Sequence, residues 1–136
     1  TVPRRTLWNS ALALIRERPW SGVGPRRLGD SYPRTLPPGD NDPALSAHSV
    51  NLETAACSGL PSLAAFLLFV AAMFARCWRR ARGLEGEARA RAAAGLGLLA
   101  AFGAHGLLDC FLNSQPVMGA FWLMLAWVTG DEEPRA

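Results

Sequence analysis

The sequence predicts an all-α membrane protein in which an amphipathic helix and a polar loop precede two to three transmembrane helices. Two observations indicate this fold class. Apolar residues fill Leu63 to Phe74 without a charged residue among them, and the largely apolar run extends from Leu60 to Trp78, about the length of helix that crosses a hydrocarbon core of roughly 30 Å. Half of the residues are hydrophobic, and most of them follow residue 60.

Composition divides the chain into two regions. We expect residues 1–59 to form an extracytoplasmic (periplasmic) helix and loop region. Residues 60–136 would hold the transmembrane helices, with a basic cytoplasmic loop at about 76–91 and a cytoplasmic C-terminal tail. The chain opens at Thr1 without the pattern of a signal peptide. We therefore expect a C-terminal piece of a longer membrane protein, inactive by itself.

Charge and cysteine content argue against two classes of function. All basic residues are arginine and the net charge is only +3. No basic stripe with interleaved aromatic residues is present, so we expect no nucleic-acid partner. The cysteines lack the spacing of a metal site, and we expect neither a metal nor a cofactor.

The first predicted helix covers residues 4–18. Its apolar residues recur at the spacing of one helical face, and they are Leu7, Trp8, Ala11, Leu12, Leu14 and Ile15. Two interpretations stay open: a helix at the membrane interface, or a helix packed on its neighbours. Pro19 ends the helix, and a turn with Gly22 and Gly24 follows. The proline-rich residues 29–46 are expected to form an irregular loop.

The distribution of arginine predicts the topology. Six arginines lie between residues 76 and 91, where only Glu85 and Glu87 oppose them. A short basic connection between two apolar segments is typical of the cytoplasmic side. The loop that carries His48 then lies outside the cytoplasm.

The second predicted transmembrane helix runs from about Ala92 to Leu112. Its glycines would allow another helix to approach closely. His105 and Asp109 lie four residues apart on one face, in the outer half of the helix. They are either a polar pair that joins helices or support for an outer active site. The apolar residues 117–130 turn back and are short for a third transmembrane helix.

His48 is the best candidate for a catalytic residue, because an imidazole accepts a proton near neutral pH. Asn51, three residues later, would orient His48 or a substrate. The structural alternative is a histidine that binds loop backbone or caps the following helix. Arg4 and the pair Arg26 and Arg27 are the arginines expected on the same side of the membrane.

Together these segments resemble the C-terminal part of the O-antigen ligase and polymerase-like membrane protein family. One block has an arginine and a tryptophan, then a proline and a GVGP turn. A second has a histidine–asparagine motif before a GLPG-like turn, and a third has a histidine and an aspartate in a late helix. In this sequence the blocks are Arg4–Trp8 with Ile15–Pro25, Ala47–Leu52 with Ala56–Leu63, and His105–Asp109. The sequence departs from the family pattern at Arg26, Val50, Cys57 and Ser62.

The resemblance implies a metal-independent glycosyltransferase in the bacterial cytoplasmic (inner) membrane, with its active loop facing the periplasm. The donor would be a glycan on undecaprenyl pyrophosphate, and the acceptor a hydroxyl of a glycan, lipid A-core or protein. His48 would deprotonate the acceptor and Arg4 would hold the pyrophosphate leaving group. Asn51, Arg26, Arg27, Gly22 and Gly24 would contribute to substrate binding, with His105 and Asp109 in support.

Two other interpretations stay open at this point. The enzyme would be an O-antigen polymerase or a protein O-oligosaccharyltransferase if its acceptor differs. A different class is a non-catalytic membrane transport or structural protein, or an inactive family member, which the departures at Val50 and Cys57 favour.

Overall fold

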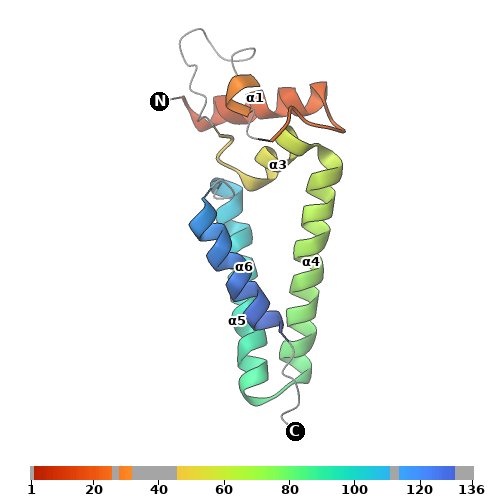
Figure 1. The fold of residues 1–136 in the computed structure, drawn as a ribbon, viewed down its shortest axis with the longest axis vertical. Coiled ribbons are helices and arrows are strands. Elements are labelled where there is room, and N and C mark those ends of the chain that lie inside the picture. Colours follow the sequence, from red (N-terminus) through yellow and green to blue (C-terminus); the bar gives the residue numbers. More distant parts are fainter. Residues whose placement is uncertain (1, 26–27, 32–45, 111–113, 131–136) are drawn as a thin grey trace. The chain divides into compact units, whose positions relative to one another are not determined.

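The computed structural model describes residues 2–25, 28–31, 46–110 and 114–130. Within these residues every regular element is a helix, which confirms the all-α prediction. Figure 1 shows the helices in chain order. They are α1 (Arg4–Glu17), α2 (Leu28–Ser31), α3 (Val50–Ser58), α4 (Leu60–Gly83), α5 (Gly86–Leu108) and α6 (Gln115–Thr129).

The chain forms two compact units. Unit 1 contains Thr1–Leu67 and His105–Phe111, and unit 2 contains Leu68–Ala104 and Leu112–Ala136. Unit 1 thus joins the region expected outside the membrane to the beginning of α4 and the end of α5. The predicted roles of residues 1–59 and 60–136 relative to a membrane stay predictions.

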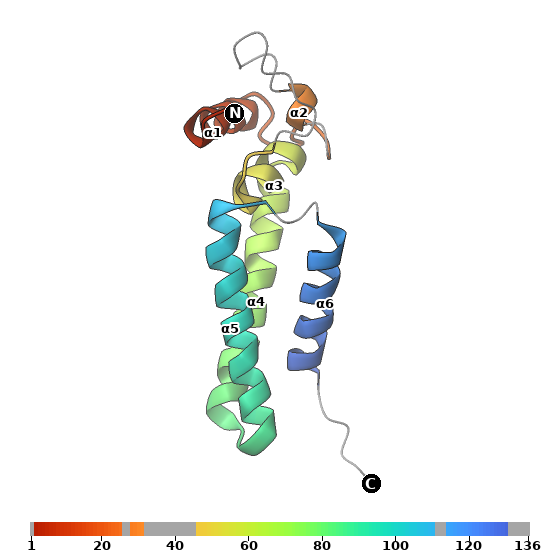
Figure 2. The same ribbon diagram turned by 90° about the vertical axis from the view of Figure 1, so that its left-hand side faces the viewer.

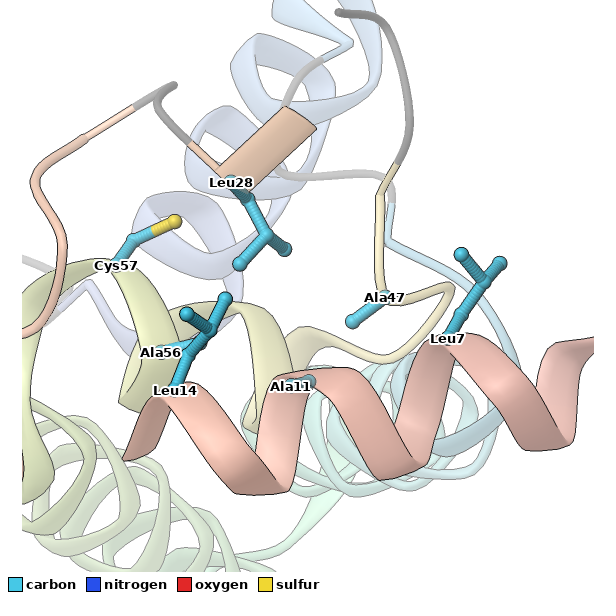
Figure 3. Packing of buried hydrophobic residues seen from close by; sticks show 7 residues of the cluster. All are labelled: Leu7, Ala11, Leu14, Leu28, Ala47, Ala56 and Cys57. Carbon is cyan, nitrogen blue, oxygen red and sulfur yellow. The ribbon is translucent and has the colours of Figure 1, made fainter. Parts of the chain in front are cut away.

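Helix α1 packs along α3 through one apolar face. Leu7, Ala11 and Leu14 are buried at the expected helical spacing, with Leu28 of α2 and Ala56 of α3 in the same cluster. Figure 3 shows Leu14 and Leu28 pointing toward each other beside Ala56. The structure therefore agrees with a helix packed on its neighbours.

The apolar face of α1 is narrower than the sequence predicts. Leu12 is 41% exposed, and Trp8 is half-buried with its indole N–H turned to the backbone of the 46–49 segment. A helix that contacts one neighbour buries only the positions that face it. Membership of an apolar stripe therefore did not identify which of its residues are in the core.

Helix α4 is one continuous apolar helix of 24 residues. Gly59, in the left-handed region at φ 85°, separates it from α3. Most of its apolar side chains are exposed, Leu68 to 71%. The core helix of a soluble protein would bury them, so this exposure fits a helix that faces lipid.

Helix α5 differs from the predicted bounds. It begins at Gly86 rather than Ala92 and ends at Leu108 rather than Leu112. Only Leu84 and Glu85 separate it from α4, so the basic segment at 76–91 is mostly helical and not a loop. Arginine is a good helix former, and both helices continue through their charged ends.

In unit 2, α6 packs on both long helices. The rings of Phe102 and Phe121 stack with centroids 4.0 Å apart, and Phe69 lies 5.6 Å from Trp122. Arg76 of α4 donates to the Thr129 carbonyl at 3.0 Å. The three helices run along one another in unit 2, as Figure 2 shows.

In the part of the chain that the structure describes, two helices, α4 and α5, are long and apolar enough to cross a membrane. Helix α6 is apolar but has only 15 residues. The expectation of two transmembrane helices thus holds by length and composition, and a third at α6 stays a prediction.

Gly95 lets α5 approach its neighbours in unit 2. An added methyl group would lie 2.8 Å from Cys77 Sγ and 3.1 Å from Val128 Cγ2. We expect Gly95→Ala to destabilise the protein by about 1–3 kcal/mol, because the buried Cys77 side chain has little room to move. Gly97→Ala is the matched control, since nothing lies within 4 Å of its added methyl.

The measurement is unfolding of the detergent-solubilised protein by heat or by added sodium dodecyl sulfate. Equal unfolding midpoints for the two alanine variants would contradict this account of the packing.

Candidate functional site

The segment before α3 carries His48 in an unusual backbone conformation. His48 has φ 46°, and no other non-glycine residue in the described part of the chain has a positive φ. This left-handed region is sparsely populated by residues with a side chain, and it persists where the surroundings hold it. The neighbouring hydrogen bonds show what holds it here.

Ala47, immediately before His48, is completely buried. Its N–H donates to Glu53 Oε2 at 2.8 Å, and its carbonyl accepts the indole N–H of Trp8 at 2.9 Å. The His48 N–H donates to Ser46 Oγ at 3.2 Å. Both peptide groups that flank Ala47 are therefore fixed, from α1 on one side and α3 on the other.

The imidazole of His48 contacts the carboxylate that follows α5. His48 Nδ1 lies 3.3 Å from Asp109 Oδ1, and the two side chains are 42% and 49% exposed. His48 Nε2 takes no part in this contact. A hydroxyl group that comes from solvent or from a bound substrate can therefore approach the pair.

Asp109 is held by its own backbone neighbourhood as well as by His48. The Cys110 N–H donates to Asp109 Oδ1 at 2.8 Å. This hydrogen bond, followed by the one from His48, lowers the pKa of Asp109 below its usual value of 3.8. Asp109 is thus ionised at neutral pH and presents a negative charge to the imidazole.

Arg4 reaches the same turn of the chain. Its Nη1 donates to the Leu108 carbonyl at 2.9 Å, one of the carbonyls that lack a partner within α5. A cation is also favoured there by the helix dipole. Arg4 and His48 lie far from residues 108 and 109 in sequence, yet they bind these two consecutive residues inside unit 1.

The turn with Gly22 and Gly24 closes the end of α3. The N–H groups of Val23 and Gly24 donate to the carbonyls of Ala56 and Cys57, each at 2.9 Å. A methyl group on Gly22, at φ 62°, would lie 2.4 Å from the carbonyl carbon of Cys57. The structure thus gives the turn a packing role.

Residues 1–67 match the family model described as O-Antigen ligase. This match, over just under half of the chain, supports an O-antigen ligase-like family member. A comparison with curated proteins gave no match. The matched residues contain Arg4 and His48, whereas Asp109 lies outside them, so the fold brings the carboxylate of Asp109 to the matched region.

Of the other predicted site residues, some lie near Asp109 or His48 and some lie outside the described residues. His105 lies one helical turn before Asp109 in unit 1, exposed, and its charge also lowers the pKa of Asp109. Asn51 is half-buried in the first turn of α3 and does not bind His48. Arg26 and Arg27 lie outside the described residues. The contribution of each to substrate binding stays a prediction.

Two residues beside the site were missed by sequence reasoning. Glu53 and Trp8 bind the backbone of Ala47, and neither was a candidate. A glutamate in the first turn of a helix is a recognised capping signal. This signal could have identified Glu53 from the sequence. Nothing in the sequence indicated that Trp8 would bind residue 47.

The part of the chain that the structure describes contains no group of three or more histidine, cysteine, aspartate or glutamate side chains arranged to hold a metal ion. The groups that meet at residues 108 and 109 are the imidazole of His48, the carboxylate of Asp109 and the guanidinium group of Arg4. These groups suit proton transfer and the binding of an anion.

The ionisation of Asp109 predicts how stability depends on pH. A carboxyl group whose pKa is lowered by folding stabilises the folded state above its usual pKa, and this stabilisation is lost as the pH falls through the lowered value. We expect Asp109→Asn to be less stable than wild type at pH 6, by no more than about 1 kcal/mol because the pair is half exposed. The difference should shrink below pH 3.8.

Thermal unfolding of both proteins in detergent between pH 6 and pH 3 measures this. His48→Ala should keep part of the stabilisation that ionised Asp109 provides, because the Cys110 N–H remains bound to Asp109. A wild-type advantage that grows on acidification would contradict the assignment.

Proposed function

We propose that the protein transfers a glycan from undecaprenyl pyrophosphate to an acceptor hydroxyl at the outer side of the cytoplasmic membrane. In the proposed reaction, the acceptor oxygen forms a bond to the anomeric carbon of the donor glycan. The bond between that carbon and the pyrophosphate oxygen breaks. The acceptor proton passes to the protein, and the electron pair of the broken bond stays on the undecaprenyl pyrophosphate.

One observation carries this proposal. A titratable imidazole and a guanidinium group bind consecutive residues, Asp109 and Leu108, in a chain whose first 67 residues match an O-antigen ligase family. The reaction needs a base for the acceptor and a cation for the leaving group. Both are present at one turn of the chain.

His48 acts as the general base in this proposal. Asp109 Oδ1 accepts a hydrogen bond from the Nδ1–H of the imidazole in this proposal, which fixes the tautomer with a lone pair on Nε2. Nε2 then takes the proton from the acceptor hydroxyl, and the ionised Asp109 stabilises the imidazolium that forms. The half-exposed position of both side chains leaves the acceptor a path to Nε2.

Arg4 binds the leaving pyrophosphate. A guanidinium group has five N–H donors, and the bond to Leu108 holds the side chain through one nitrogen. The remaining donors suit a phosphate group, which gains negative charge as the glycosidic bond breaks. The fixed cation would supply this stabilisation without a metal ion.

Loss of either side chain should abolish most of the transfer. We expect His48→Ala to lower glycan transfer by roughly 100-fold or more, in line with the loss of a general base. Arg4→Ala should lower it by a similar factor, since one charge-stabilising donor contributes about 100- to 1,000-fold. The measurement is transfer of a lipid-linked glycan by the full-length protein in membranes.

Arg5→Ala is the matched control for Arg4, because Arg5 is the adjacent arginine and is also exposed on α1. It should transfer glycan normally. Arg4→Lys keeps the charge but not the fork of donors, and should fall between wild type and Arg4→Ala. Wild-type transfer by His48→Ala and Arg4→Ala, both inserted normally, would reject the proposal.

The proposal also requires that unit 1 face the outside of the cell. In a protein whose half-buried native cysteine Cys110 is replaced by serine, Ser21→Cys should react with an impermeant thiol reagent added to intact cells. Ser21 is exposed, and cysteine is nearly isosteric with it. Gly83→Cys, at the exposed end of α4, should react only after the membrane is opened. The reverse pattern would place His48 in the cytoplasm and exclude the proposed reaction.

A further inference from the structure

We propose that Glu53 is a positioning residue that holds His48 in its left-handed backbone conformation and so aims the imidazole at Asp109. This inference rests on the proposed function, because it takes His48 as the base. Glu53 would not touch the substrate. It acts through the backbone of Ala47.

Glu53 is a buried acidic residue. Its side chain is only 8% exposed in the first turn of α3, where burial raises the pKa of the carboxyl group. A carboxylate is rarely buried unless something binds it. Its hydrogen-bonded partner here is the Ala47 N–H, at 2.8 Å, so the burial is directed at the segment that carries His48.

Hydrogen bonds connect Glu53 with the backbone that leads into His48. Glu53 holds the peptide group before Ala47, and the indole of Trp8 holds the carbonyl of the peptide group after it. Ser46 Oγ accepts the N–H of that same second peptide group. With both peptide planes fixed, the direction of the His48 side chain is set by the dihedral angles of His48 alone.

The left-handed conformation of His48 has an energetic cost. A non-glycine residue in the left-handed region is held at a cost of the order of 1–3 kcal/mol, and the surrounding contacts must supply it. Without the Glu53 bond, the 46–48 segment would relax toward an ordinary negative φ. The imidazole would then leave Asp109, because a change in φ of His48 turns its Cβ away.

The variant that tests this is Glu53→Ala in the full-length protein. We expect kcat for glycan transfer to fall roughly 10- to 100-fold with KM for the donor little changed, since a misdirected base costs rate and not binding. Glu53→Gln keeps a carbonyl oxygen that accepts the Ala47 N–H, and should restore most of kcat. Glu17→Ala, at an exposed glutamate of α1, is the matched control and should behave as wild type.

A double variant separates positioning from simple damage to the fold. If Glu53 acts only through His48, adding Glu53→Ala to His48→Ala should cause no further loss of the residual transfer. An additional loss in the double variant, or equal activity of the alanine and glutamine variants, would overturn the inference. Full transfer by Glu53→Ala would also overturn it.

Nitrogen NMR supplies a readout that needs no activity. The Nδ1 resonance of ¹⁵N-labelled His48, assigned by its disappearance in His48→Ala, reports the bond to Asp109. It should move in Glu53→Ala to where it lies in Asp109→Asn, and stay near its wild-type position in Glu53→Gln. An unmoved resonance in Glu53→Ala would reject the positioning role.

Trp8→Phe is a second variant that tests the same inference if Glu53→Ala fails to fold. It removes the indole N–H from the Ala47 carbonyl and keeps an aromatic ring at the half-buried position. The same fall in kcat and the same shift of the Nδ1 resonance are expected. If His48→Ala itself transfers glycan normally, the proposed function fails; if it does not but the Glu53 and Trp8 variants are normal, only this inference fails.

Discussion

In unit 1, helices α1 and α3 are joined through the backbone of the buried residue Ala47. It has no functional group of its own, yet a carboxylate from α3 and an indole from α1 bind its two flanking peptide groups. Buried backbone polar groups must find partners, and here the partners come from two different helices. The same bonds that satisfy this backbone also join the helices and set the direction of the next residue, His48.

The glycine turn at residues 22–24 supports this arrangement from the other end of α3. Helix ends leave carbonyl groups without partners, and the turn supplies two N–H groups to Ala56 and Cys57. Only glycine at residue 22 allows the backbone to come this close. Helix α3 is short, at nine residues, and isolated helices of that length are marginal. Its position is therefore maintained by contacts at both ends rather than by its own propensity.

The candidate site combines a segment inside the family match with a residue outside it. His48 and Arg4 belong to the matched residues 1–67, and both bind the turn at residues 108–109. The end of an apolar helix offers unpaired carbonyls and a negative dipole end, which attract an arginine, while the following aspartate attracts the imidazole. The lowered pKa of Asp109 shows that its neighbours stabilise the charged carboxylate.

The sequence by itself determined the helical class, the apolar character of α4 and α5, and the residue types of the site. Periodicity and run length are local properties, so they can be read directly from neighbouring residues. The helix bounds at 86 and 108, the buried subset of the α1 stripe and the roles of Glu53 and Trp8 were decided only by tertiary structure. Trp8 lies 39 residues from its partner Ala47, and Arg4 lies 104 residues from Leu108. Such pairings follow from packing between helices, which no local pattern records.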